Sequence, residues 1–199
     1  LVGSGMCIRD SKVDLLELDE MTFRRRRRTS EGTFGIHLSL QVSRATSDIV
    51  KECGQDGGVA TALLLSALNS GMIDGAIVST VDPNHPWCPI PILAKTREEI
   101  LAGAGTKYTY SPGLLALKQN AGQSLKRIAF VGTPCQILAI RRMQKANLRK
   151  LVEPVVLTMG LFCSESFTYG GLMEERIQKG FGLDLHEVAK MNIKGKMQV

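Results

Sequence analysis

Two cysteines each follow a stretch that predicts a buried strand, and their thiols are well placed for chemistry. Cys135 comes shortly after a strand predicted at residues 127–131. Thr133 and Pro134, between that strand and Cys135, predict the cap and first turn of a helix. The sulfur of Cys135 should therefore lie near the positive end of the helix dipole, which favours a thiolate. Local chemistry leaves three roles open for Cys135: a nucleophile, a cluster ligand or a thiol without a role.

Cys163 ends a second apolar run, residues 155–162. If the two strands are neighbours, both cysteines lie on the same rim, where ligands gather in open α/β sheets. Two thiolates that converge there indicate a metal site more than catalysis, although an iron–sulfur cubane normally has four protein ligands. Cys53 and Cys88 are candidates for the others, with simple packing as their default explanation.

A glycine motif, Gln55-Asp56-Gly57-Gly58, precedes an apolar run that predicts a long helix. Asp56 suits a helix N-cap, whereas each glycine costs about 1 kcal/mol of helix propensity relative to alanine. Glycines often allow close approach to the backbone, and free N–H groups at a helix start suit an anionic or carbonyl-bearing ligand. Because the Asp56 carboxylate would compete with a phosphate, the motif favours a flavin ring or ribityl chain. A plain capped helix explains the same residues.

The loop at residues 103–112 combines small residues and hydroxyl groups with one lysine. Thr106, Tyr108 and Ser111 are suitable for lining a phosphorylated cofactor. Lys107 could offset negative charge on a reduced flavin or a phosphate. An ordinary solvated loop has a similar composition, so that explanation also stays open.

Charge and cysteine usage exclude several classes of protein. The net charge of +6 comes from five consecutive arginines, residues 24–28, without which 20 basic residues nearly balance 19 acidic ones. Such a run is usually a solvated, mobile segment, so we expect no nucleic-acid partner. Five cysteines without a secretory signal suit a reducing compartment, which predicts a cytoplasmic protein. The sequence contains no apolar run long enough to span a membrane, and its three histidines are isolated and expected to be structural.

Strands and helices alternate along the chain, which predicts an α/β fold with a mainly parallel or mixed sheet and flanking helices. The proline-rich residues 82–89 are predicted to be irregular. The expected strands are residues 37–44, 75–80, 92–95, 127–131 and 155–162. The expected helices are residues 56–68, 97–103, 113–120, 134–146, 169–179 and 185–190.

Four segments in order resemble one known family: Gln55-Asp56-Gly57-Gly58; Gly105-Thr106-Lys107-Tyr108 with Ser111-Pro112; Gly132-Thr133-Pro134-Cys135-Gln136; and Gly160-Leu161-Phe162-Cys163. Together with Ile73-Asp74-Gly75-Ala76 and Lys190-Met191-Asn192-Ile193, they resemble the coenzyme F-420 hydrogenase/dehydrogenase beta-subunit family. That family includes formate dehydrogenase beta subunits and hydroxymethyl chlorophyll reductases. The resemblance covers residues 40–199.

The resemblance implies an oxidoreductase subunit with FAD and a 4Fe-4S cluster, in which the flavin exchanges a hydride with coenzyme F-420 and passes electrons singly to clusters. It implies that Cys135 and Cys163 are cluster ligands and that further ligands lie in a downstream Cys-x-x-Cys segment. The implied partners are other redox subunits or ferredoxin. We expect the cofactors to contact Gln55, Asp56, Gly57, Gly58, Thr61, Thr106, Lys107, Tyr108, Ser111, Gly132, Thr133, Pro134 and Gln136.

The sequence predicts three parts of the chain. Residues 1–11 back-translate into the end of a sequencing-library adapter except at Gly5, so we expect an assembly scar there. Residues 12–36 predict a lead-in or linker. Residues 37–199 predict a flavin-binding domain that is truncated before its C-terminal cluster-ligand segment, so the cluster-ligand set would be incomplete.

Three alternative functions stay open at this point. The first is a ferredoxin-dependent reductase of a tetrapyrrole-type substrate on the same scaffold. The second is a basic nucleic-acid-binding module that depends on the arginine run. The third is a relic or interaction module without a cofactor.

Overall fold

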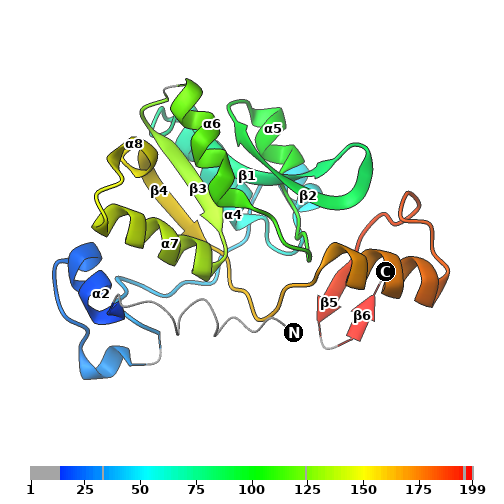
Figure 1. Ribbon diagram of the computed structural model, residues 1–199, viewed down its shortest axis with the longest axis horizontal. Helices are drawn as coiled ribbons and strands as arrows, with labels where there is room; N and C mark the ends of the chain where they lie inside the picture. Colours follow the sequence, from blue (N-terminus) through cyan, green and yellow to red (C-terminus); the bar gives the residue numbers. More distant parts are fainter. Residues whose placement is uncertain (1–13, 33, 124, 195, 199) are drawn as a thin grey trace.

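A four-stranded sheet forms the centre of the molecule (Figure 1), whose computed structural model describes residues 14–32, 34–123, 125–194 and 196–198. The strands β1 (Gly75–Asp82), β2 (His85–Ala94), β3 (Ile128–Gly132) and β4 (Val155–Gly160) lie in the order β2-β1-β3-β4. β1 pairs antiparallel with β2, whereas β1 with β3 and β3 with β4 are parallel. The sheet is therefore mixed, and the predicted α/β fold is confirmed. The predicted scar at residues 1–11 lies outside the described residues.

Helices flank this sheet. They are α2 (Leu15–Phe23), α3 (Asp48–Cys53), α4 (Val59–Asn69), α5 (Arg97–Ala102), α6 (Ala116–Gln123), α7 (Pro134–Lys145) and α8 (Arg149–Val152), with the short 3-10 turns η1 (Thr29–Glu31) and η2 (Gly113–Leu115). The predictions for residues 97–103, 113–120 and 134–146 are confirmed by α5, by η2 with α6, and by α7. None of the helices in the described part of the chain is long and apolar enough to cross a membrane.

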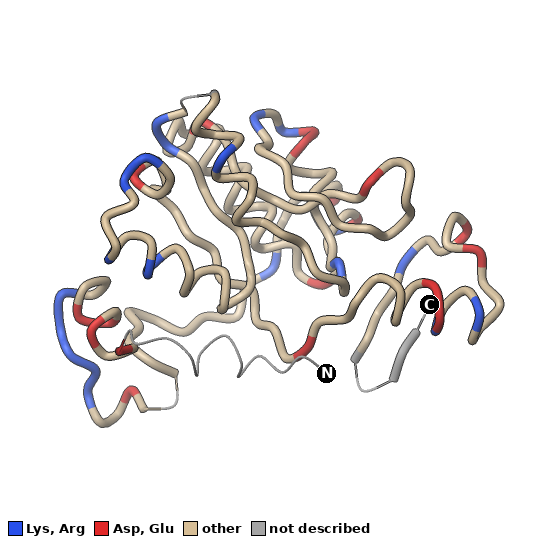
Figure 2. The backbone as a smooth tube through the Cα atoms, in the orientation of Figure 1, with Lys and Arg blue, Asp and Glu red and all other residues tan. Residues whose placement is uncertain are grey.

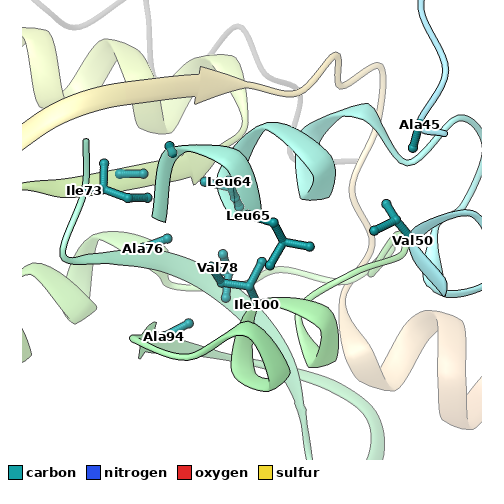
Figure 3. Close-up of a cluster of buried hydrophobic side chains, with 11 residues drawn as sticks. Ala45, Val50, Leu64, Leu65, Ile73, Ala76, Val78, Ala94 and Ile100 are labelled. Atoms are coloured by element: carbon teal, nitrogen blue, oxygen red, sulfur yellow. The ribbon is translucent and has the colours of Figure 1, made fainter. Parts of the chain in front are cut away.

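The two faces of the sheet pack against separate apolar cores. Ala76 and Val78 of β1 belong to a core that includes side chains from α3, α4 and α5 (Figure 3). Ile77 of β1 and Phe130 of β3 belong to the other core, with side chains from α6, α7 and α8. Because successive side chains of a strand point to opposite faces, one short strand contributes to both cores.

The prediction that residues 82–89 are irregular is wrong, because β2 begins at His85. Pro89 and Pro91 lie within this strand, opposite Val81 and Ser79 of β1. A proline lacks the N–H that a ladder needs, but β2 is an edge strand of the sheet, and edge strands tolerate proline. The strand predicted at residues 92–95 corresponds to the end of β2, which stops at Ala94.

The prediction that Asp56 begins the long helix is also wrong, since α4 begins at Val59 with Gly58 as its N-cap. Gly58 has φ +67°, and a Cβ there would lie 2.9 Å from both Cγ1 and the carbonyl oxygen of Val50. Close packing of α3 against this turn therefore requires glycine, which sequence periodicity does not reveal. At the other end, α4 stops at Asn69 and Gly71 adopts φ +69°.

Residues 37–44 do not form the predicted strand. They pair with no strand of the described sheet, and the side chains of Leu38 and Val42 are fully exposed. The alternation of polar and apolar residues is present in the sequence, but a strand also needs a neighbour to complete its hydrogen bonds.

The arginine run makes ion pairs with nearby acidic residues. Arg24, Arg26, Arg27 and Arg28 are nevertheless exposed to solvent, as predicted. Arg25 forms an ion pair with Glu31 at 2.5 Å, and Arg27 forms one with Asp19 at 2.8 Å. Arg26 pairs with Glu20. Figure 2 shows the acidic residues of α2 and η1 beside the basic run. The predicted lead-in therefore has a structure of its own, and α2 contacts α7, to which the Glu17–Lys145 ion pair joins it.

The last part of the chain forms a small lobe, residues 167–194, reached by the exposed residues 161–165. It holds a π-type helix, η3 (Gly170–Gly180), and β5 (Asn192–Lys194), which pairs with β6 (Lys196–Gln198). The predicted helix at 169–179 is confirmed, whereas 185–190 contains only a turn. Met173 and Ile177 centre a third apolar core, against which Trp87 and Tyr108 of the main body pack.

Candidate functional site

The carboxyl ends of the parallel strands bring two predicted motifs together. Gly132, at the end of β3, pairs with Gly160, at the end of β4. Cys135 follows the first of these strands by three residues and Cys163 follows the second by three. The prediction that these cysteines follow neighbouring strands on one rim of the sheet is therefore confirmed.

Cys135 lies in the first turn of α7 and is exposed. Its Sγ lies 3.1 Å from the hydroxyl oxygen of Thr133, the N-cap residue, and Pro134 occupies the first helical position as predicted. The sulfur is thus available to an outside ligand at the positive end of a helix.

Cys163 is also exposed, in the segment that joins β4 to the lobe. Its thiol contacts the carbonyl oxygen of Glu165 at 3.5 Å, and the hydroxyl of Ser166 lies 4.0 Å from Sγ. The preceding Phe162 is fully exposed. Both rim thiols are therefore exposed, and Cys163 follows an exposed apolar side chain.

These thiols do not complete a cluster site by themselves. Within the described ranges, no group of three or more histidine, cysteine or acidic residues could hold a metal ion. Cys53 is exposed at the end of α3, and Cys88 is half-buried on β2. Because a cubane normally has four protein ligands, the donor set of the described residues does not fit a complete cluster.

Gln136 and Ser111 join the rim to the loop at residues 103–112. The amide nitrogen of Gln136 donates to the carbonyl of Ser111 at 2.8 Å, and its amide oxygen accepts from the backbone N–H of Thr133 at 3.1 Å. The Ser111 hydroxyl lies 2.6 Å from that of Ser79 on β1. One glutamine therefore ties together β3, α7 and the loop, and Ser79 is a member of this group that sequence reasoning missed.

Gly132 allows close packing of side chains at this junction. A Cβ at Gly132 would lie 2.6 Å from Oε1 of Gln136 and 2.6 Å from Cε1 of Phe130. The missing side chain is therefore what allows Gln136 to lie across the end of β3.

The side chain of Lys107 turns back onto its own loop. Its ammonium donates to the carbonyl oxygens of Gly103 at 2.8 Å, Ala104 at 2.6 Å and Gly105 at 3.4 Å. Burial lowers the pKa of Lys107 from 10.5 to about 8. The lysine thus fixes the shape of the loop, and its neighbour Thr106 is exposed.

Tyr108 holds the C-terminal lobe against this loop. Its phenolic oxygen accepts from the backbone N–H of Ile193 at 3.0 Å, and its carbonyl accepts from the N–H of Phe167 at 3.1 Å. The side-chain amide of Gln55, in the glycine motif, donates to the carbonyl of Met191 at 3.0 Å. Two motifs far apart in sequence therefore hold the same short segment of the lobe.

The glycine motif is a packed turn that opens α4. The carbonyl of Gly57 accepts from the N–H of Ala45 at 2.7 Å, and a Cβ at Gly57 would lie 3.3 Å from the carbonyl oxygen of Ser43. Asp56 is exposed and Thr61 is buried in the first turn of α4. Packing therefore accounts for glycine at Gly58, and a Cβ at Gly57 would make a tight contact.

Two buried oxygen atoms beside Tyr108 fit a bound organic cofactor. The hydroxyl of Thr109 and Oδ1 of Asn192 have no hydrogen-bond partner within the described chain. Neither residue was singled out as a cofactor contact from the sequence, although Asn192 lies in one of the recognised motifs. Burial depends on tertiary structure, so no local signal marks Thr109.

Two surface hollows lie elsewhere on the molecule. One, of about 500 Å³, is lined by residues that include Lys126, Lys150 and Pro154, and the other, of about 290 Å³, includes Arg149 and Val155. These residues lie near the amino ends of β3 and β4, whereas Cys135 and Cys163 follow the carboxyl ends. The hollows are therefore separate from the candidate site.

Comparison with known proteins places two family models on the chain. The model described as coenzyme F-420 hydrogenase/dehydrogenase, beta subunit N-term, matches residues 41–118. A second model, which describes the C terminus of the same beta subunit, matches residues 125–199.

Several relatives share this similarity. The chain is 37% identical to the coenzyme F-420 hydrogenase subunit beta of Methanothermobacter thermautotrophicus, over 83% of this chain and 59% of that protein. A chain of the F-420-reducing NiFe hydrogenase complex from Methanosarcina barkeri has a TM-score of 0.73 and 38% identity, covering 80% of this chain and 57% of that one. The 7-hydroxymethyl chlorophyll a reductase of Oryza sativa is 33% identical, over 86% of this chain and 34% of that enzyme. The chain thus spans less than two thirds of each of these proteins.

Proposed function

Because this chain belongs to the coenzyme F-420 hydrogenase/dehydrogenase beta-subunit family, we propose that it is part of an oxidoreductase subunit that binds FAD and passes electrons between coenzyme F-420 and iron–sulfur carriers. One observation carries the proposal: hydrogen bonds join segments that the sequence predicted separately as cofactor contacts. Gln136 is bonded to Ser111, while Gln55 and Tyr108 both bond to the lobe.

The proposed roles of the chain's residues are to bind and position the cofactors. A bound flavin would accept two electrons as a hydride and release them singly, which neither a deazaflavin nor a cluster does alone. Lys107 and Gln136 fix the loop at residues 103–112, and Tyr108 closes the lobe over it. A fixed loop provides a preorganised surface, so little ordering free energy is lost when the cofactor binds.

For the cluster, Cys135 and Cys163 are the proposed ligands in this chain. Both thiols are exposed on one rim, and helix α7 directs its positive end towards Cys135. The remaining ligands of a 4Fe-4S cluster would come from outside the described residues.

We further propose that the chain works within an assembly of redox subunits. The Methanosarcina barkeri relative comes from a hydrogenase complex. Leu161 and Phe162, next to Cys163, are exposed apolar residues of the kind that protein interfaces cover.

Titration of the purified chain with FAD tests the flavin part of the proposal. Quenching of flavin fluorescence that saturates at one FAD per chain is the expected result, because the loop and lobe are already joined. The proposal would be refuted by a chain that binds no FAD, riboflavin or coenzyme F-420, even at ligand concentrations far above the dissociation constants of typical flavoproteins.

A second candidate is a ferredoxin-dependent reductase of a tetrapyrrole-type substrate, which the similarity to the Oryza sativa reductase favours. Both candidates predict flavin binding. They differ in the electron donor, since the second predicts that reduced ferredoxin bleaches the bound flavin and that reduced coenzyme F-420 does not.

A further inference from the structure

Two buried oxygen atoms lie where the C-terminal lobe meets the main body. One is the hydroxyl of Thr109, a residue that is only 4% exposed, and the other is Oδ1 of Asn192. Neither has a hydrogen-bond partner among the residues that the structure describes. Buried polar atoms in native proteins are nearly always bonded, so each of these oxygens needs an explanation.

The two residues border the same small core. Tyr108 precedes Thr109, Ile193 follows Asn192, and the Ile193 N–H donates to the Tyr108 phenolic oxygen at 3.0 Å. The side chains of Tyr108, Met191 and Ile193 all belong to the apolar core of the lobe. The two residues with unbonded oxygens are therefore the sequence neighbours of the two partners in one hydrogen bond.

Their chemistry is complementary. An amide oxygen only accepts a hydrogen bond, whereas a hydroxyl can donate one. A ligand edge that presents an N–H beside a carbonyl would satisfy both atoms at once. Flavins and deazaflavins share such an imide edge on the pyrimidine side of the ring.

The surroundings also favour a neutral ligand group over a phosphate. Lys107 is two residues from Thr109, but its ammonium is already bonded to the carbonyls of Gly103 and Ala104. The groups left unbonded are a neutral amide and a neutral hydroxyl, which match an imide better than an anion.

Resting on the proposed function, we infer that Thr109 and Asn192 bind the imide edge of a flavin or deazaflavin ring. The imide N–H donates to Oδ1 of Asn192, and the Thr109 hydroxyl donates to a neighbouring ring carbonyl. The ring then lies at the junction of the loop and the lobe, so the contacts of Gln55 and Tyr108 with the lobe complete its site.

The variants T109V and N192L test this inference in the 199-residue chain, because each replaces the polar group by an apolar one of similar size. FAD and coenzyme F-420 are titrated separately, which shows which ring occupies the edge. We expect each variant to raise the Kd of that ring about tenfold, as the loss of one buried hydrogen bond would. The melting temperature without ligand should stay the same or rise, since an unbonded buried oxygen has been removed.

N120L provides the matched control for stability. Asn120 is 2% exposed, and its amide bonds both the carbonyl and the N–H of Leu125 at 3.1 and 3.2 Å. Its replacement should therefore lower the melting temperature. A similar fall in T109V or N192L would show that these oxygens are bonded within the protein and would overturn the inference.

Methylation of the imide nitrogen gives a second, chemical test. If FAD is the occupant, wild type should bind the methylated FAD about tenfold more weakly than FAD, while N192L should bind the two about equally. The same comparison applies to the deazaflavin if that ring is the occupant. Equal affinities of wild type and both variants would overturn the assignment of Thr109 and Asn192 and leave the proposed function intact. A wild type that binds neither ring would overturn both.

Discussion

Replacing Gln136 by leucine removes two hydrogen bonds at the point where β3, α7 and the 103–112 loop meet. The Thr133 N–H loses its acceptor at 3.1 Å, and the Ser111 carbonyl loses its donor at 2.8 Å. Each bond contributes about 0.5–1.5 kcal/mol net, so Q136L should lower the free energy of unfolding by about 1–3 kcal/mol. For a chain of this size that corresponds to a fall of roughly 2–12 °C in melting temperature.

Thermal unfolding followed by circular dichroism measures this effect. Q119L is the matched control, because Gln119 is an exposed glutamine on α6. Q136E separates the two bonds, since a carboxylate still accepts from Thr133 but faces the Ser111 carbonyl without a proton to donate. It should therefore be less stable than wild type. A melting temperature for Q136L equal to that of Q119L would refute the view that Gln136 joins the rim to the loop.

Three further outcomes follow from the charges and thiols. Burial lowers the pKa of Lys107 from 10.5 to about 8, so the unfolded chain binds more protons than the folded chain between these pH values. The stability of wild type should therefore rise with pH relative to that of K107M, by up to about 1.4 kcal/mol per pH unit. Parallel profiles of stability against pH for the two proteins would contradict this. Arg25 and the Arg28 N–H lower the pKa of Glu31 from 4.5 to about 2, so the stabilisation that ionised Glu31 provides is lost as pH falls through this range. Faster hydrogen exchange of residues 14–32 at low pH should show that loss in wild type. The same loss in E31Q would contradict the assignment to Glu31. Metal analysis of the purified chain should find no bound iron, whereas stoichiometric iron would show that Cys53 or Cys88 completes a cluster site.

The sequence predicts the rim of the sheet well because that prediction depends on local pattern. The apolar runs before Cys135 and Cys163 are short and continuous, as in buried parallel strands, and strand neighbours follow from the alternation of elements. The Thr133 cap and Pro134 at the first helical position are equally local signals.

Features that depend on tertiary neighbours could not be predicted in this way. Whether residues 37–44 pair depends on a strand elsewhere, and whether prolines fit in β2 depends on its position at the edge of the sheet. Gly58 is required by the packing of Val50, which lies in another helix. The burial of Thr109 and Asn192 likewise becomes visible only when the lobe packs against the loop.

Anaerobic mixing of the FAD-loaded chain with reduced coenzyme F-420 tests the central claim most directly. The absorbance of oxidised flavin and of oxidised coenzyme F-420 are followed together after mixing. The account predicts that flavin absorbance falls while coenzyme absorbance rises, with one coenzyme oxidised for each FAD reduced. Retention of oxidised flavin in a chain that demonstrably binds both rings would contradict it.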